Sequence, residues 1–326
     1  MTIHDRRALK AEGARILANT PNQKRLVLLY AGASALLSLA AALISYLLNT
    51  GIAGTGGLAG IGLRSTLDTA QQVLSMATSI ALPFWGLGYT HTVLKMSRQQ
   101  PVRETTLLEG FRRFGPGLRQ MLLQSFLFMG LFMLCIYIAI LILSMTPLAA
   151  PAYELLEPMV DQYMADPNWM PDDATYTAFI DALLPITICS SILGCVPLLF
   201  LFYRLRFSQM RLMDDPRCGA RQALGDSFRI TRKYCLALFK LDLSFWWFWL
   251  LSGMVTVISF GDVILSYLDV SLPLAPEAAS WFFSILATVI QVALYVAFQN
   301  RVSITYALAY DTLLPKPDNS QLAIEN

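Results

Sequence analysis

Asp242 is the residue of this chain whose type and position are best suited to chemistry. It lies between Lys240 and Ser244 at the inner boundary of an apolar run. A charge inside a bilayer is costly, so an ionisable residue at this depth is a functional lead by default. The alternative interpretation, which we favour, is that Asp242 caps a helix or pairs with Arg229 or Arg232.

His91 lies near the inner end of another apolar run, where an imidazole could relay protons. A histidine at this depth is more often an interfacial residue with its hydrogen bonds satisfied, and we favour that interpretation. His4 is the only other histidine, and the five cysteines form no Cys-x-x-Cys pair. We therefore expect no metal site, no cofactor and no disulfide.

Asp214, Asp215 and Pro216 form the clearest local signal for a helix start. A carboxylate can cap the first turn of a helix, and proline is favoured at its first position because its missing N–H is not needed there. The pattern predicts a helix that begins at this tripeptide.

An acidic segment with no lysine or arginine runs from residue 120 to residue 203. Within it, Asp166, Asp172 and Asp173 could collect a divalent cation, but their spacing fits no calcium-binding loop. We interpret them as solvated carboxylates on the outer side of a membrane.

Basic residues gather in the segment 204–240, which holds nine positive and three negative charges. Each cation near an anionic leaflet contributes about 1 kcal/mol to binding. These charges either contact lipid headgroups or only fix the topology, and nucleic acid is not expected because they flank apolar runs. The candidate headgroup contacts are Arg204, Arg206, Arg229, Arg232 and Lys233.

The elements that must position these residues are membrane spans. Hydrophobic residues make up 56% of the 326-residue chain and charged residues only 14%, far from the balance of a water-soluble domain. A helix needs about 20 apolar residues to cross the hydrocarbon core. The predicted fold is all-α, with six spans in three hairpins: 26–48, 69–94, 120–145, 183–203, 243–260 and 279–297.

Lysine and arginine give the orientation, because they stay on the cytoplasmic side of short loops. With the N-terminus inside, 23 of the 24 basic residues fall in cytoplasmic segments, and Arg64 is the exception. The sequence thus predicts a multi-pass inner-membrane protein with both termini in the cytoplasm. Its parts are a cytoplasmic leader (1–25), a membrane domain (26–315) and a polar tail (316–326).

Each hairpin is preceded by a basic stretch with an apolar stripe, which predicts an amphipathic helix lying on the inner membrane surface. The three stretches share the order of a leucine, a small residue and an apolar residue before arginine. They indicate a threefold repeat over 5–98, 104–213 and 219–315, although unrelated amphipathic leaders would also look alike.

From Pro197 to Phe245 the sequence resembles the uncharacterised bacterial membrane family catalogued as domain of unknown function 975. The resemblance rests on the proline of the fourth span, the run 214–216, Ser227 and Phe-x-Leu-Asp-Leu-Ser-Phe at 239–245. The chain departs from the family pattern at 233–236 and 246–248. The resemblance implies a multi-span membrane protein, and it brings no substrate, activity or catalytic residue.

The expected function is a non-enzymatic scaffold or regulator of an envelope process, with a basic surface on anionic lipid. The alternative is a small-molecule transporter in which Pro83 and Pro197 act as hinges. An intramembrane enzyme is the third class, and it requires Asp242 or His91 to share a cavity with a second polar group.

Overall fold

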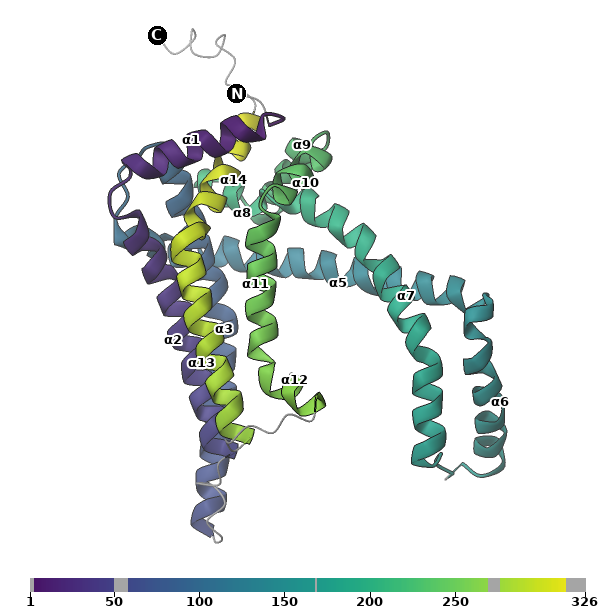
Figure 1. Ribbon diagram of the computed structural model, residues 1–326. Coiled ribbons are helices and arrows are strands. Elements are labelled where there is room, and N and C mark those ends of the chain that lie inside the picture. Colours follow the sequence, from purple (N-terminus) through teal and green to yellow (C-terminus); the bar gives the residue numbers. More distant parts are fainter. Residues whose placement is uncertain (1–2, 50–57, 168, 269–275, 315–326) are drawn as a thin grey trace. The chain divides into compact units, whose positions relative to one another are not determined.

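The computed structural model describes residues 3–49, 58–167, 169–268 and 276–314, and all regular structure in these ranges is helical (Figure 1). The predicted tail, 316–326, lies outside the described residues. The chain divides into two compact units, of which unit 1 comprises 1–118 and 207–326 and unit 2 comprises 119–206. Each unit is described by itself.

Unit 1 begins with an amphipathic helix followed by a long helical hairpin. Asp5 caps the first helix, since its carboxylate accepts a hydrogen bond from the N–H of Ala8 at 3.1 Å. The two hairpin helices pack together, and the rings of Tyr30 and Tyr89 stack with centroids 4.3 Å apart. These helices are α1 (Arg6–Asn19), α2 (Gln23–Asn49) and α3 (Leu58–Ser97).

A short leader, η2 (Glu104–Leu108) and α4 (Glu109–Arg112), packs against α3 at backbone distance. A Cβ placed on Gly88 of α3 would lie 1.7 Å from the carbonyl oxygen of Leu107. One placed on Gly110 would lie 2.0 Å from the carbonyl oxygen of Phe84. Glycine is therefore required on both sides of this contact.

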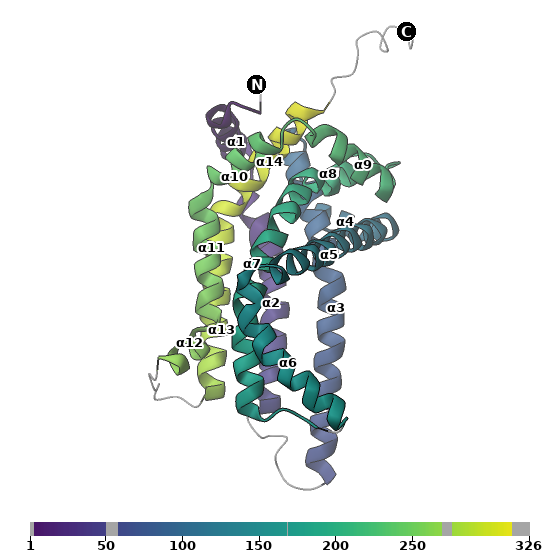
Figure 2. The ribbon, with the colours of Figure 1, turned by 90° about the vertical axis from the view of Figure 1, so that its right-hand side faces the viewer.

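The second half of unit 1 adds three short helices, a bent pair and a long helix. In Figures 1 and 2, α11 and α13 run side by side, and α13 also packs against α2. Helix α13 continues through a π-helical turn, η4, into α14, and α14 packs on α1 and α3. These elements are α8 (Ser208–Asp214), α9 (Ala220–Thr231), α10 (Cys235–Leu243), α11 (Trp246–Ser259), α12 (Gly261–Tyr267), α13 (Pro276–Leu294), η4 (Tyr295–Gln299) and α14 (Asn300–Leu313).

Unit 2 contains most of α5 (Phe114–Ser144), η3 (Pro147–Ala149), α6 (Ala150–Ala165) and α7 (Asp173–Leu205). Its long helices expose large apolar side chains, among them Phe126 at 77% and Val196 at 66%. Apolar surface of this kind is what a helix presents to lipid rather than to water. The acidic segment that we predicted as a loop contains α6, which packs against α7.

Among the described residues, four helices are long and apolar enough to cross a membrane, or five if the bent pair is one span. The four are 23–44, 114–144, 173–214 and 278–313. The bent pair is α10 and α11, which meet at an angle of 66°. Residues 69–94, predicted as the second span, fall within the 40 residues of α3 but not among these candidates. Polar residues such as Gln71 and Gln72 lower its hydropathy.

The prediction that a helix starts at Pro216 is wrong. Helix α8 ends at Asp214, and α9 begins at Ala220 with Gly219 as its N-cap. The Asp215 carboxylate accepts a hydrogen bond from the N–H of Arg217 at 2.9 Å, and its carbonyl accepts one from the N–H of Cys218 at 3.1 Å. The Asp215 carboxylate therefore closes a turn on its own backbone instead of capping the start of α9.

Candidate functional site

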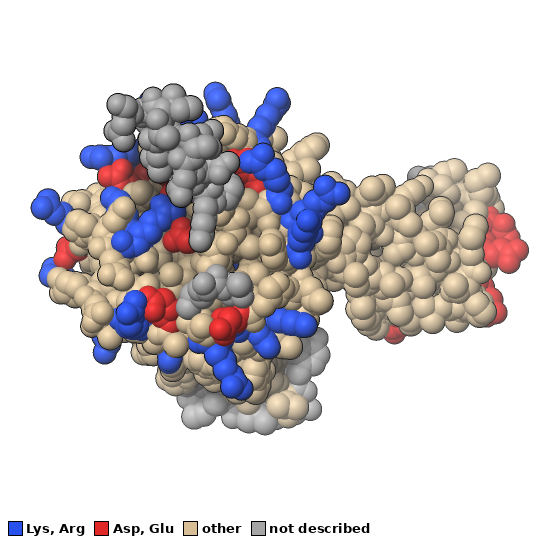
Figure 3. Space-filling model, turned by 90° about the horizontal axis from the view of Figure 1, so that it is seen from above, with Lys and Arg blue, Asp and Glu red and all other residues tan. Residues whose placement is uncertain are grey.

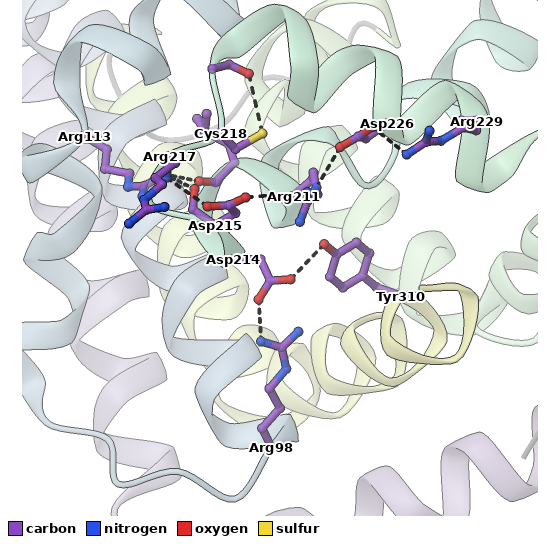
Figure 4. Close-up of polar contacts among 12 residues, drawn as sticks. Arg98, Arg113, Arg211, Asp214, Asp215, Arg217, Cys218, Asp226, Arg229 and Tyr310 are labelled. Atoms are coloured by element: carbon purple, nitrogen blue, oxygen red, sulfur yellow. Dashed lines mark hydrogen bonds and ion pairs between the residues drawn. The ribbon is translucent and has the colours of Figure 1, made fainter. Parts of the chain in front are cut away.

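The polar cluster of unit 1 is built around Asp214, the last residue of α8 (Figure 4). Its carboxylate pairs with the guanidinium of Arg98, directly after α3, and accepts a hydrogen bond from the hydroxyl of Tyr310 at 3.1 Å. Arg98 also donates to Asp311 at 2.7 Å. Asp214 thus joins the end of α3 to α8 and α14.

The charge state of Arg98 is fixed by these partners. Its hydrogen bond with Asp214 raises the pKa of the guanidinium above its ordinary value, burial opposes this, and Asp311 raises it further. Arg98 therefore stays cationic at every pH at which the protein is folded.

A second set of ion pairs extends from the α8–α9 turn (Figure 4). Arg211 donates to Asp226 at 2.9 Å and lies 3.6 Å from Asp215. Arg113 donates to the carbonyl oxygens of Asp215, at 2.9 Å, and Leu212. The arrangement holds the leader before α5 against the turn, which is a structural task.

Asp242 has a partner that the sequence did not indicate. Its carboxylate accepts a hydrogen bond from the hydroxyl of Tyr306 in α14. Arg229, which we expected as a partner of Asp242, pairs with Asp226 at 3.1 Å. Asp242 therefore ties α10 to α14.

Ser244 lies in the bend between α10 and α11. Its hydroxyl donates to the carbonyl of Leu241 at 2.6 Å, and its own carbonyl accepts a hydrogen bond from Lys10 at 2.6 Å. Ser244 was predicted as a candidate polar position beside Asp242, and its contact with a distant helix is made by its backbone carbonyl.

His91 is half-buried in α3, and its Nδ1 is buried without a hydrogen-bond partner among the described residues. Asp242 lies on α10. A groove lined by serine and threonine hydroxyls, the hydroxyl groove, lies between α2, α11 and α13 and is described below. Neither His91 nor Asp242 lines it, so this groove does not bring the two residues together.

The five candidate headgroup residues belong to different units. Arg204 and Arg206 lie in unit 2, where each guanidinium sits over an aromatic ring, that of Phe200 at 5.4 Å and that of Phe202 at 5.1 Å. Arg229, Arg232 and Lys233 lie in unit 1, and all three are exposed. Figure 3 looks onto this end of unit 1, where lysine and arginine side chains gather.

Two polar features escaped sequence reasoning. The hydroxyl of Tyr89 donates to the amide oxygen of Asn300 at 2.9 Å, and the Asn300 amide donates to the carbonyl of Gln23 at 2.9 Å. These residues belong to three helices, α2, α3 and α14, that are distant in sequence. The only signal for them was their similar place at the ends of predicted spans.

The second feature is a groove of about 350 Å³ between α2, α11 and α13. Its polar lining includes Ser34, Ser38, Ser252 and Gln291, and the Gln291 amide donates to the Ser252 hydroxyl at 3.4 Å. The hydroxyl side chains recur at helical spacing, which could have been read from the sequence.

No group of three or more histidine, cysteine, aspartate or glutamate side chains in the described part of the chain is placed to hold a metal ion. Asp172 instead caps α7, where it accepts a hydrogen bond from the N–H of Thr175 at 3.3 Å. Hydrogen bonds from the side chain of Thr175 and from its backbone N–H lower the pKa of the Asp172 carboxyl, so the residue is anionic at neutral pH.

The long apolar helices of the described residues are typical of an all-helical, multi-pass membrane protein. The model of the family described as "Protein of unknown function (DUF975)" matches residues 1–274, and the chain belongs to this family. The expected resemblance is thereby confirmed over most of the chain. No curated protein and no solved structure matches it.

Proposed function

We propose that this protein is a non-enzymatic scaffold or regulator in a bacterial inner membrane, whose basic cytoplasmic end binds anionic lipid headgroups. The observation that carries the proposal is that exposed basic side chains at the end of α9 are followed along the chain by exposed apolar side chains on α10. Exposed Arg229, Arg232 and Lys233 are followed directly by exposed apolar side chains of α10. These are Leu236 (66% exposed), Phe239 (40%) and Leu243 (57%).

Cations beside an apolar ridge suit a helix that lies in the membrane interface. The ridge enters the boundary between headgroups and acyl chains, and the cations meet the phosphates. The 66° bend between α10 and α11 supports this, because it turns α10 away from the direction of the span that follows. The basic residues would then lie at headgroup depth.

The topology in this proposal has six spans and cytoplasmic termini. It counts α3 and the bent pair as spans in addition to the four apolar helices. Support comes from length, since the 40 residues of α3 exceed the roughly 20 needed to cross. It also comes from charge, since segments 120–203 and 241–300 hold no lysine or arginine.

The non-enzymatic part rests on how the acidic residues are engaged. Asp214 and Asp242 each bind side chains of other helices, which is the pattern of a structural network. We therefore assign these two carboxylates a structural role, which is to hold helices together.

A transporter is the second candidate, and the hydroxyl groove favours it. Serine, threonine and glutamine side chains facing a groove in an apolar bundle could line a solute path. Protein-dependent solute uptake by proteoliposomes that is lost on changing Gln291 to leucine would favour the transporter over the scaffold.

The test of lipid binding uses full-length protein exchanged into nanodiscs that contain equal amounts of phosphatidylglycerol and phosphatidylcholine. Native mass spectrometry then measures which lipid stays bound after release. The triple variant R229Q/R232Q/K233Q should lose most of the preference for phosphatidylglycerol, since each cation contributes about 1 kcal/mol.

A matched control removes the same charge elsewhere. Arg15, Arg112 and Arg217 are exposed but do not adjoin the apolar side chains of α10 in the sequence. R15Q/R112Q/R217Q should therefore keep the preference for phosphatidylglycerol. Equal loss in both variants, or no preference in the unchanged protein, would refute a specific headgroup surface on α9 and α10.

A further inference from the structure

A basic hollow of about 520 Å³ lies between the start of α1 and the bend that follows α10. Its lining is His4, Asp5, Arg6, Arg7, Lys10 and Ser244. None of the residues that we predicted as headgroup contacts is part of it.

The charge of the hollow is strongly unbalanced. Asp5 is its one acidic residue, and the Asp5 carboxylate is engaged as the N-cap of α1. Burial lowers the pKa of the Lys10 ammonium, and the positive charges of Arg301 and Arg6 lower it further. Like charges are therefore held close together, a setting that an anion would relieve.

The cations are fixed in place by the backbone at the end of α10. Arg6 donates to the carbonyl of Lys240 at 3.1 Å, and Lys10 donates to the carbonyl of Ser244 at 2.6 Å. The Lys10 ammonium also sits 4.1 Å from the centre of the Phe245 ring. An arginine has five N–H donors and a lysine three, so both retain donors after these contacts.

The hollow adjoins side chains suited to the membrane boundary. Leu243 and Trp246 flank Ser244 and are 57% and 59% exposed. An exposed tryptophan at the start of an apolar helix is typical of the interface between headgroups and hydrocarbon. If α11 enters the bilayer here, the hollow lies at the depth of the lipid phosphates.

We propose that this hollow binds a phosphate group, with Arg6, Arg7 and Lys10 supplying the positive charge and His4 a further hydrogen-bond donor. The inference deepens the proposed function and rests on its orientation of α10 and α11. The phosphate belongs either to an anionic lipid or to a soluble phosphate compound, and the two sources are separable by experiment.

The experiment uses full-length protein in an uncharged detergent and measures its thermal unfolding midpoint. One arm adds short-chain phosphatidylglycerol, another adds inorganic phosphate, and a third adds short-chain phosphatidylcholine with sodium chloride at matched ionic strength. The variant H4Q/R7Q is chosen because His4 and Arg7 are exposed. R15Q is the matched control, because Arg15 is an exposed residue of α1 that does not line the hollow.

We expect the half-saturating concentration of phosphatidylglycerol or phosphate to rise about fivefold or more in H4Q/R7Q and to stay unchanged in R15Q. The single variant R7K retains His4 and the positive charge at position 7, so it should bind as the unchanged protein does. This comparison separates the loss of charge from a change of fold. A response to phosphatidylglycerol alone identifies a lipid site, and equal responses to both identify a soluble phosphate site.

No stabilisation by either phosphate source, or the same response in H4Q/R7Q as in the unchanged protein, would overturn the inference. The proposed function fails separately. The proposed function stands if R229Q/R232Q/K233Q loses the nanodisc preference while H4Q/R7Q keeps it, and the hollow is then excluded as a lipid site. The reverse result would keep the hollow and exclude the surface on α9 and α10.

Discussion

At the scale of single residues, two acidic side chains of unit 1 act as connectors between helices. Asp214 meets Arg98 and Tyr310, and Asp242 meets Tyr306, so both join parts of the chain that are far apart in sequence. A buried or half-buried charge is costly when its partner is removed. This is why their substitution should affect stability first.

We predict that D214N lowers the free energy of unfolding by about 1–3 kcal/mol, because Arg98 loses its charged partner in a partly buried place. The side chain of Asp214 is only 14% exposed. The measurement is the thermal midpoint of the purified protein in detergent.

The control for D214N is D161N, which removes an exposed carboxylate of α6. It should change the free energy of unfolding by no more than about 0.5 kcal/mol, so its midpoint should stay close to that of the unchanged protein. Equal midpoints for D214N and the unchanged protein would show that the Arg98 pair contributes little.

At the scale of elements, the close contact between α3 and the leader η2–α4 depends on glycine. An alanine at Gly88 would place its Cβ 1.7 Å from the carbonyl oxygen of Leu107, so backbone must move. We predict that G88A costs about 1–3 kcal/mol or more, as overpacking does elsewhere.

The matched control is G32A on α2, where an added Cβ meets nothing within 4 Å. It should be neutral or slightly stabilising, because alanine favours helix over glycine. Both variants are compared by thermal midpoint, and equal effects of the two would contradict a close backbone contact at Gly88.

The sequence predicted the all-helical class and the positions of the long helices well, because apolar runs of this length have few alternatives. It missed α6, whose acidic residues looked like a solvated loop, and it misplaced the start of α9. In the second case, local hydrogen bonds of the Asp215 carboxylate competed with capping. The predicted leader before α2 does form a helix, α1, and its apolar residues Leu9, Ile16 and Leu17 are buried.

The connections of the candidate site were beyond sequence reasoning. Tyr89 and Asn300 meet because α3 and α14 pack together, and nothing in the periodicity of either helix specifies its neighbour. The basic hollow was missed for a related reason. Its cations come from α1 and its backbone acceptors from the end of α10, so neither segment shows the site alone.

At the scale of the whole molecule, the proposed orientation of the spans depends on one rule, that lysine and arginine stay on the cytoplasmic side. The end of unit 1 where they gather carries α1, α9 and the end of α14, as Figures 1 and 3 show. In the proposed topology, the acidic segment with α6 faces the opposite side of the membrane. The lipid-binding proposals follow only if this orientation is correct.

The most direct test places single cysteines in a variant whose five natural cysteines have been replaced. Met170 lies in the acidic segment and Arg221 on α9, and both are exposed. Right-side-out membrane vesicles are treated with a membrane-impermeant maleimide before and after permeabilisation. We predict that M170C reacts in intact vesicles and R221C only after they are opened. Reaction of R221C in intact vesicles, with M170C protected, would contradict the account.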